Sequence, residues 1–185
     1  MYQGTSQHTV TGCGAAFIEE TQTDDGIFIT SSTPGFVIDR GITNASNMGA
    51  AMATAAADTI MRHLQFNNTT LSDYDLVATG DLGKIGLEMA KEMIESHGFN
   101  DTRGVLNDCG VMIYDINTQD AGCGGSGCGC SAVTFSSYIY EMMKKGIYKK
   151  VLLIGTGAMM SPQALLQGLS IPAVAHLVEF EGRNS

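Results

Sequence analysis

Short apolar segments alternate with segments of helical character from residue 48 to residue 181, and this alternation constrains the fold more than any other feature. We expect helices over residues 48–66, 84–97 and 131–145, and strands over residues 75–79, 150–155 and 173–181. The uninterrupted apolar run at 151–154 is typical of a strand that is buried on both faces. Strands that alternate with helices in this way predict an α/β fold, in which helices pack against a sheet.

The first two of these helices carry local signals at their ends. Asn47 stands directly before the first helix and can accept a hydrogen bond from its first turn, as N-cap residues do. Residues 48–58 are almost all small, so another element can approach this helix closely and we expect burial on more than one side. Gly98 follows the second helix and is expected to end it in the left-handed conformation.

The remaining segments carry weaker signals. Residues 9–20 and 26–31 indicate two strands, and the turn residues at 23–26 predict that these strands form a hairpin. Residues 34–43 are expected to be an irregular connection, and residues 156–172 a long loop. Residues 105–115 fit neither the helical nor the strand period clearly.

Charge and composition exclude several classes of function. Asp and Glu number 19 against 10 Lys and Arg, which gives a net charge of −9. This balance argues against nucleic-acid binding and against docking on anionic lipid through basic residues. The sequence contains no apolar stretch of about 18 residues, so we expect no transmembrane segment. The first residues lack the features of a signal peptide, and we therefore expect a cytoplasmic chain whose five cysteines are free thiols.

The glycine-rich segment at 122–132 has the sequence Gly-Cys-Gly-Gly-Ser-Gly-Cys-Gly-Cys-Ser-Ala and is the most unusual part of the chain. Its first interpretation is an anion cradle, because glycines allow close backbone approach and the helix that follows offers free N–H groups. Residues 122–127 satisfy the pattern G-x-G-x-x-G, but no clear strand precedes them. No Lys follows them either, so a nucleotide cofactor is not expected.

Two other interpretations concern the cysteines of this segment. Cys123, Cys128 and Cys130 could bind a metal with Cys109 or His176 as a fourth ligand, but their spacing fits no standard zinc or iron–sulfur site. The alternative is that these cysteines are small apolar groups in a crowded core. We predict that the cluster holds no metal.

The other polar candidates are isolated in the sequence. Asp81 follows the strand at 75–79, and it can either contact a ligand or cap the next helix. His8, His63 and His97 lie near element ends and are expected to be solvated, whereas His176 is expected to be a satisfied core histidine. No Ser/His/Asp or Cys/His set forms at a familiar spacing, so the residues alone indicate a ligand-binding α/β domain and no reaction.

Six motifs in order along the chain resemble the stage V sporulation protein AD family of endospore-forming bacteria. They span residues 9–16, 48–60, 73–83, 108–115, 124–132 and 168–176. The resemblance covers essentially the whole chain, and it corresponds to the second half of the family's chain plus the hairpin that ends the first half. It implies a thiolase-like layered fold, similar to β-ketoacyl synthase III, with residues 1–46 ending the first half and residues 47–185 forming the C-terminal half. The helix at 131–145 would lie centrally between the two sheets.

The resemblance also implies a function. The family binds dipicolinic acid, a planar dianion, and supports its uptake, with calcium, into the developing spore. The expected partners are therefore dipicolinic acid, possibly with calcium, and other stage V sporulation membrane proteins. The expected location is cytoplasmic or peripheral on the spore inner membrane. The first half of the fold is absent from this chain, so we expect either homo-oligomers or packing against that missing half.

The same resemblance argues against catalysis. The synthases use a Cys nucleophile from the first half and a His and an Asn from the second half. Those second-half positions fall within residues 79–81 and near Cys128 here, so both groups are replaced and no cofactor is implied. Two alternatives stay open, which are an active synthase-like acyltransferase and a purely structural subunit of the spore membrane channel assembly.

The resemblance places the ligand among the loops at 79–82, 125–131 and 156–159. No Lys or Arg lies in these loops, so backbone N–H groups of Gly127, Gly129 and Cys130 and the serine hydroxyls are the expected donors. Asp81 would then cap a helix, pair with a cation of the missing half, or meet the ligand through calcium. The expected ligand-binding residues are Gly80, Asp81, Gly125, Ser126, Gly127, Cys128, Gly129, Cys130, Ser131 and Gly157.

Overall fold

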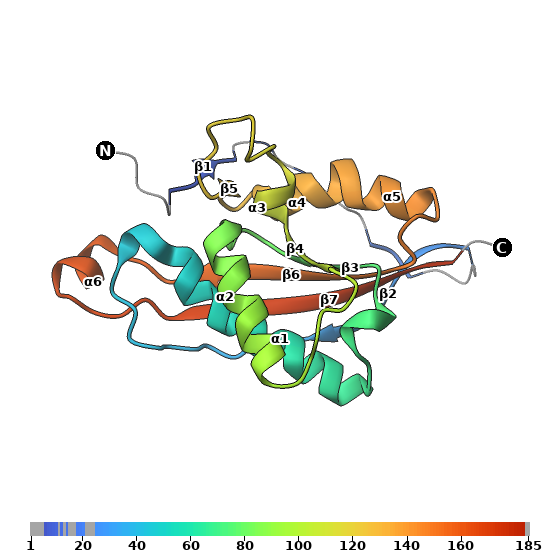
Figure 1. Cartoon of the computed structure of the whole chain (residues 1–185), viewed down its shortest axis with the longest axis horizontal. Helices are drawn as coiled ribbons and strands as arrows, with labels where there is room; N and C mark the ends of the chain where they lie inside the picture. The colour runs from blue at the N-terminus through green and yellow to red at the C-terminus, as the bar shows by residue number, and fades with distance from the viewer. Residues whose placement is uncertain (1–5, 11, 13, 15–17, 21–24, 184–185) are drawn as a thin grey trace.

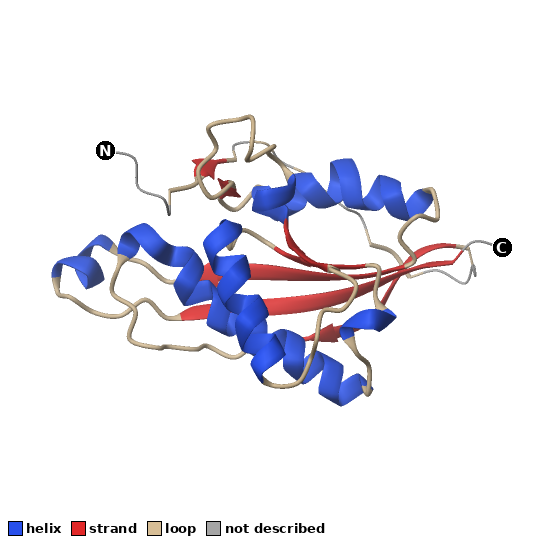
Figure 2. Cartoon of the chain, viewed as in Figure 1, coloured by secondary structure: helices blue, strands red, loops and turns tan. Residues whose placement is uncertain are grey.

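A five-stranded mixed sheet forms the centre of the protein (Figures 1 and 2). The computed structural model describes residues 6–10, 12, 14, 18–20 and 25–183. The strand order is β2-β7-β6-β3-β4, in which β3 is parallel to β4 and β6, whereas β7 is antiparallel to β6 and β2. The strands are β2 (Gly26–Thr33), β3 (Leu76–Thr79), β4 (Leu106–Asp108), β6 (Lys150–Ala158) and β7 (Ala173–Arg183).

Helices cover both faces of this sheet (Figure 1). The helices α1 (Met48–Asn67) and α2 (Gly83–Ser96) lie on one face. A continuous helical run lies on the other face, made of α4 (Cys130–Thr134), the π-helical η3 (Phe135–Ile139) and α5 (Tyr140–Lys144). The α/β prediction is therefore confirmed, and the finer thiolase-like layering stays a prediction.

The smaller elements complete the described part of the chain. A separate two-stranded sheet joins β1 (His8–Thr9) to β5 (Gly125–Ser126) in parallel. The short helices are η1 (Ala45–Asn47), η2 (Leu71–Asp73), α3 (Cys109–Met112) and α6 (Pro162–Leu166). Among the helices of the described residues, none combines the length and apolar character that crossing a bilayer requires.

The central strands of the sheet are buried on both faces, as the apolar run at 151–154 predicts. Val77, Leu152 and Ile154 belong to the core that lies under α1 and α2. Ala78 and Val151 belong to a second core, which lies under the helical run from α4 to α5. Alternate residues of the same strands thus serve two separate cores, because side chains of a strand point to opposite faces in turn.

The helix signals in the sequence are confirmed. The Asn47 side chain accepts a hydrogen bond from the Ala50 N–H at 3.3 Å, and Gly98 adopts a positive φ of 89° beyond the end of α2. The small residues of α1 allow α2 to come close. A Cβ on Gly49 would lie only 2.3 Å from the Leu82 carbonyl oxygen, so this crossing requires glycine.

The hairpin predicted for residues 9–20 and 26–31 is wrong for the described residues. Thr9 is the only described residue of 9–20 that lies in a strand, and its partner strand is β5. β2 pairs instead with β7, which offers a longer partner inside the main sheet. Most of the predicted turn, at 21–24, lies outside the described residues.

Two further expectations are corrected, and one segment that had no clear period is assigned. The ambiguous region at 105–115 contains the strand β4 followed directly by the helix α3. The spacing of its apolar residues therefore changes from that of a strand to that of a helix within the segment. The expected loop at 156–172 contains the end of β6 and also α6, which Ser161 caps through the Ala164 N–H. His176 is exposed, and its Nδ1 accepts a hydrogen bond from the Gly35 N–H at 3.0 Å.

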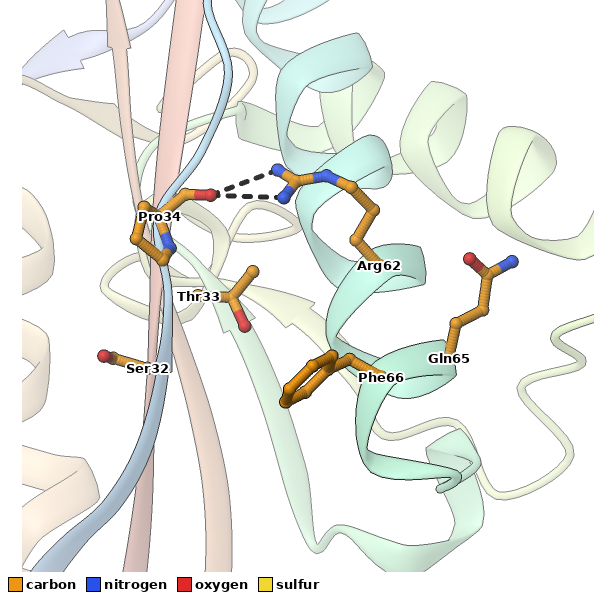
Figure 3. A pocket seen from close by; sticks show the side chains of 6 residues that line it. All are labelled: Ser32, Thr33, Pro34, Arg62, Gln65 and Phe66. Carbon is orange, nitrogen blue, oxygen red and sulfur yellow. Dashed lines mark hydrogen bonds between the residues drawn. The ribbon is translucent and has the colours of Figure 1, made fainter.

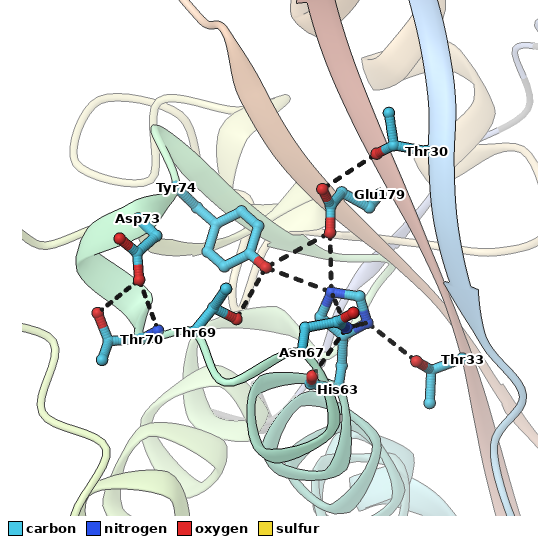
Figure 4. A network of polar contacts seen from close by, with 9 residues as sticks. All are labelled: Thr30, Thr33, His63, Asn67, Thr69, Thr70, Asp73, Tyr74 and Glu179. Atoms are coloured by element: carbon cyan, nitrogen blue, oxygen red, sulfur yellow. Dashed lines mark hydrogen bonds and ion pairs between the residues drawn. The ribbon is translucent and has the colours of Figure 1, made fainter.

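His63 is fully buried rather than solvated, at the centre of a polar network between α1 and the sheet (Figure 4). One ring nitrogen lies 3.1 Å from a Glu179 carboxylate oxygen, and the other lies 2.9 Å from the Thr33 hydroxyl. The buried Tyr74 hydroxyl lies 3.3 Å from the same histidine. Burial, the largest influence, lowers the pKa of His63, while the hydrogen bond to Glu179 opposes this effect.

Candidate functional site

A cavity of about 310 Å³ opens where the ends of β3 and β6 meet the glycine-rich segment. The ends of parallel neighbouring strands share one edge of the sheet, which brings these distant segments together. The expected site residues that line the cavity are Gly80, Asp81, Ser126, Gly127, Cys128, Ser131 and Gly157. The structure therefore collects most of the expected ligand-binding set around one space.

Three expected residues do not line this cavity. Gly125 is buried in β5, and Cys130 is fully buried at the start of α4. A Cβ on Gly129 would lie 2.1 Å from the Gly12 carbonyl oxygen, so this glycine allows close packing of the chain against itself. The contribution of these three residues to ligand binding stays a prediction.

Sequence reasoning missed several residues of the lining. Met48 and Met52 reach the cavity from the first turns of α1, and Gly155 reaches it from β6. Their only sequence signal is membership of an apolar or small-residue run, which describes core residues equally well. Only the crossing of α1 over the edge of the sheet brings them to the site.

Asp81 connects the three segments that form the cavity. Its carboxylate accepts hydrogen bonds from the Gly127 N–H at 2.9 Å, the Ser126 hydroxyl at 3.1 Å and the Thr156 hydroxyl at 2.8 Å. Asp81 therefore does not cap α2, which was one of the two roles left open. The side chain holds the glycine-rich segment against the ends of β3 and β6.

Two of the three expected backbone donors have partners of their own in the chain. The Gly127 N–H bonds to Asp81, and the Cys130 N–H bonds to the Gly127 carbonyl oxygen at 2.9 Å. A ligand that uses either group must share or replace these bonds. The described residues that line the cavity include no Lys, Arg or His, and Asp81 gives them a single formal charge, which is negative.

Asp108, to which sequence reasoning gave no role, fixes the helices next to the cavity. Its buried carboxylate accepts hydrogen bonds from the Thr79 hydroxyl at 2.6 Å and from the Leu82, Gly83, Gly110 and Val111 N–H groups at 2.8–3.2 Å. It thus caps both α2 and α3. Burial raises the pKa of Asp108 to about 6, and the hydrogen bonds from Thr79, Leu82 and Gly83 oppose this rise.

The three cysteines of the glycine-rich segment differ in their exposure to solvent. Cys128 is exposed beside the cavity, whereas Cys123 and Cys130 are buried. Burial raises the pKa of Cys130 to about 12 and also raises the pKa of Cys109, so both thiols stay protonated at neutral pH. Within the described ranges, no three His, Cys, Asp or Glu residues gather in a way that could hold a metal ion. The prediction of a metal-free cluster awaits measurement.

Comparison with known proteins shows the family of this chain. A family model described as stage V sporulation protein AD matches residues 2–181. The chain is 44% identical over 177 residues to stage V sporulation protein AD of Bacillus subtilis (strain 168). This alignment covers 96% of the present chain. The chain belongs to the stage V sporulation protein AD family. The alignment covers 51% of that relative, so the chain spans about half of its length. The resemblance inferred from the sequence motifs is thus confirmed.

Proposed function

We propose that the cavity between β3, β6 and the glycine-rich segment binds dipicolinic acid without chemical conversion, as part of its uptake into the developing spore. Family membership and the convergence of the expected residues on one cavity support this proposal. A volume of about 310 Å³ lies at the small end of the usual range for ligand pockets, which suits a small planar acid.

The charge of the site sets a condition on this binding. Dipicolinate is a dianion, and Asp81 adds a third negative charge to a lining whose described residues include no cation. Calcium that enters with the ligand would relieve the repulsion, because it binds oxygen ligands and carboxylates in particular. Asp81, Ser126 and Thr156 offer such oxygens side by side. A cation from the other half of the family's fold would serve the same purpose.

The residues at the cavity favour binding over catalysis. Asp81 stands near the position of the synthase histidine, and an ionised carboxylate can only accept hydrogen bonds, so it cannot stabilise a developing oxyanion. Cys128 stands near the position of the asparagine, and a thiol is a weak donor. We propose a site that keeps the pocket of a synthase without its second-half catalytic donors.

Calorimetric titration with dipicolinate, with and without calcium, tests the proposal. The Gly157→Leu variant should weaken binding at least tenfold, because its side chain would occupy part of the cavity. A Cβ at this position would meet nothing closer than 4.0 Å, so the backbone tolerates the change. The nearly isosteric Cys128→Ser variant should bind almost as well as the wild type.

Gly157 is a sharper test than the two loop glycines. Valine at Gly127 would strain a backbone with a φ of 115°, and valine at Gly129 would collide with residue 12. Loss of binding in either variant would therefore not distinguish a blocked ligand from a disturbed loop. Normal binding by a folded Gly157→Leu variant would show that the ligand binds elsewhere.

The two alternatives predict different outcomes. Acyl transfer from acyl-CoA that is lost in an Asp81→Ala or Cys128→Ala variant would show a synthase-like enzyme. No heat of binding for dipicolinate in any condition, together with no acyl transfer, would favour a structural subunit of the spore membrane assembly.

A further inference from the structure

We propose that the groove between β2 and α1 binds an extended segment of a partner protein, which adds a strand beside β2, the edge strand of the sheet among the described residues. This site is separate from the proposed dipicolinate cavity. The cavity contacts α1 at Met52, and the nearest groove residue on α1 is Arg62, ten residues further along. At 1.5 Å per residue, the two places lie about 15 Å apart along the helix.

The first observation is the edge formed by β2. Among the described residues, β7 is its only partner strand, and β2 stands at one end of the strand order. Its eight residues, Gly-Ile-Phe-Ile-Thr-Ser-Ser-Thr, include no charged side chain that would discourage pairing. The other edge strand, β4, has three residues. The pairing of β2 with β7 shifts register between Ile29 and Ser31, so the regular edge beside the groove is Ser31–Thr33.

The second observation is the groove itself, which has a volume of about 520 Å³ (Figure 3). Ser32, Thr33 and Pro34 form one wall, and Arg62, Gln65 and Phe66 form the other. Figure 3 shows Phe66 and Arg62 pointing from the helix toward the strand. The Arg62 guanidinium donates to the Pro34 carbonyl oxygen at 3.3 and 3.2 Å and so closes one end of the groove.

The lining defines the chemistry of the partner segment. An extended chain can pair with the outward backbone groups of Ser31–Thr33, since alternate residues of an edge strand point their N–H and C=O groups away from the sheet. Phe66 is 88% exposed and would pack against an apolar side chain of that segment.

A carboxylate of the partner segment would meet Arg62, which is the only cation among the described residues that line the groove. Asp58 holds the Nε of Arg62 at 2.8 Å and thereby orients the guanidinium toward the groove. Nη2 also donates to the Thr59 hydroxyl at 3.3 Å, so four of the five guanidinium N–H groups have partners and one N–H of Nη1 remains for the partner carboxylate. The partner is therefore an extended segment with one apolar and one acidic side chain.

Synthetic heptapeptides of alternating valine and serine provide the probe. One valine is replaced by phenylalanine, and the next residue on the same face is replaced by glutamate. We expect the 185-residue chain to bind this peptide, and we expect at least tenfold weaker binding after replacement of its phenylalanine by alanine or its glutamate by lysine. Methylation of the peptide backbone at successive nitrogens should weaken binding at alternate positions only, because a strand bonds its neighbour through every second residue.

Two variants of the chain locate the binding surface. Phe66→Ser should weaken binding at least tenfold with little effect on stability, because this side chain is largely exposed. Ile147→Ser, at an exposed apolar residue outside the groove, should leave binding unchanged.

Four results would overturn the proposal: no binding of any peptide, equal losses in both variants, a methylation profile without alternation, or a wild-type dimer that Phe66→Ser converts to monomer. The last result would identify a second copy as the occupant.

Discussion

At the scale of single residues, two carboxylates organise the edge of the sheet that carries the candidate site. Asp81 accepts its hydrogen bonds from the segments that form the cavity, whereas Asp108 accepts five from the starts of α2 and α3 and from Thr79. The sequence left two roles open for Asp81, contact with a ligand or capping of the helix that follows it. The side chain that caps this helix, α2, is Asp108. Asp108 thus stabilises the helices next to the cavity, and Asp81 shapes the cavity itself.

Replacement of Asp108 by alanine should lower the free energy of unfolding by about 3 kcal/mol or more. The change leaves several buried N–H groups without an acceptor, and each such group costs about 1–3 kcal/mol. Urea denaturation followed by circular dichroism measures the difference. Glu92→Ala, at an exposed acidic residue of α2, is the control and should stay within about 0.5 kcal/mol of the wild type. Similar losses in the two variants would contradict a special role for Asp108.

The buried His63 should make the protein sensitive to mild acid. Burial lowers the pKa of His63 below its ordinary value near 6.5, so the unfolded chain binds a proton that the folded protein excludes. The stability that His63 contributes is therefore complete above about pH 6.5, and it declines as the pH falls from there to the lowered pKa of the folded state.

Urea midpoints of the wild type and of His63→Gln, compared between pH 7 and pH 5, measure this contribution. The wild type should lose more stability than the variant over that interval, even though the variant is less stable at pH 7. His97→Gln, at an exposed histidine, should behave as the wild type does. Parallel curves for all three proteins would disprove the role assigned to His63.

At the scale of elements, the crossing of α1 and α2 depends on small residues where the two helices meet. A Cβ on Gly49 would lie 2.3 Å from the Leu82 carbonyl oxygen, and a Cβ on Gly86 would lie 2.9 Å from the Gly49 carbonyl oxygen. This close crossing fixes the start of α1, which supplies Met48 and Met52 to the cavity. The run of small residues at 48–58 therefore serves both packing and the candidate site.

A methyl group at Gly49 should separate the two helices. We expect Gly49→Ala to lower the free energy of unfolding by about 1–3 kcal/mol, because the backbone carbonyl that the new Cβ meets cannot move aside easily. Gly155→Ala is the matched control, since its Cβ would have an ordinary contact of 3.9 Å with the His176 carbonyl oxygen. A loss in Gly155→Ala as large as that in Gly49→Ala would show that the crossing has no special requirement. Thermal unfolding compares the two.

At the scale of the whole molecule, one end of the sheet carries a group of exposed apolar side chains. Residues 151–178 contain no Asp, Glu, Lys or Arg. Within this segment Met159, Leu166 and Leu169 are exposed around α6, and Val37 lies beside Met159 in a second hollow. Exposed apolar groups that gather in this way usually mark contact surfaces.

We therefore predict that the isolated 185-residue chain self-associates at micromolar concentrations. Light scattering should give a mass above the 19.5 kDa of one chain. The double variant Leu166→Lys and Leu169→Lys should move the mass toward that of one chain, because charge opposes burial of this surface. A monodisperse wild-type monomer would contradict the prediction.

The sequence by itself determined the order of most helices and strands, since apolar periodicity, the Asn47 cap and Gly98 are local signals that tertiary contacts did not override. It also determined the family, and the resemblance brought together most of the residues that line the cavity. The sequence did not predict which strands pair with β1 and β2. Many segments can pair with a given strand, and the pairing is fixed only when the whole sheet forms. β2 thus joined β7, and β1 joined β5. The tertiary structure alone decided the burial of His63 and the capping of α2 by Asp108, because the partners of both lie far away in the sequence.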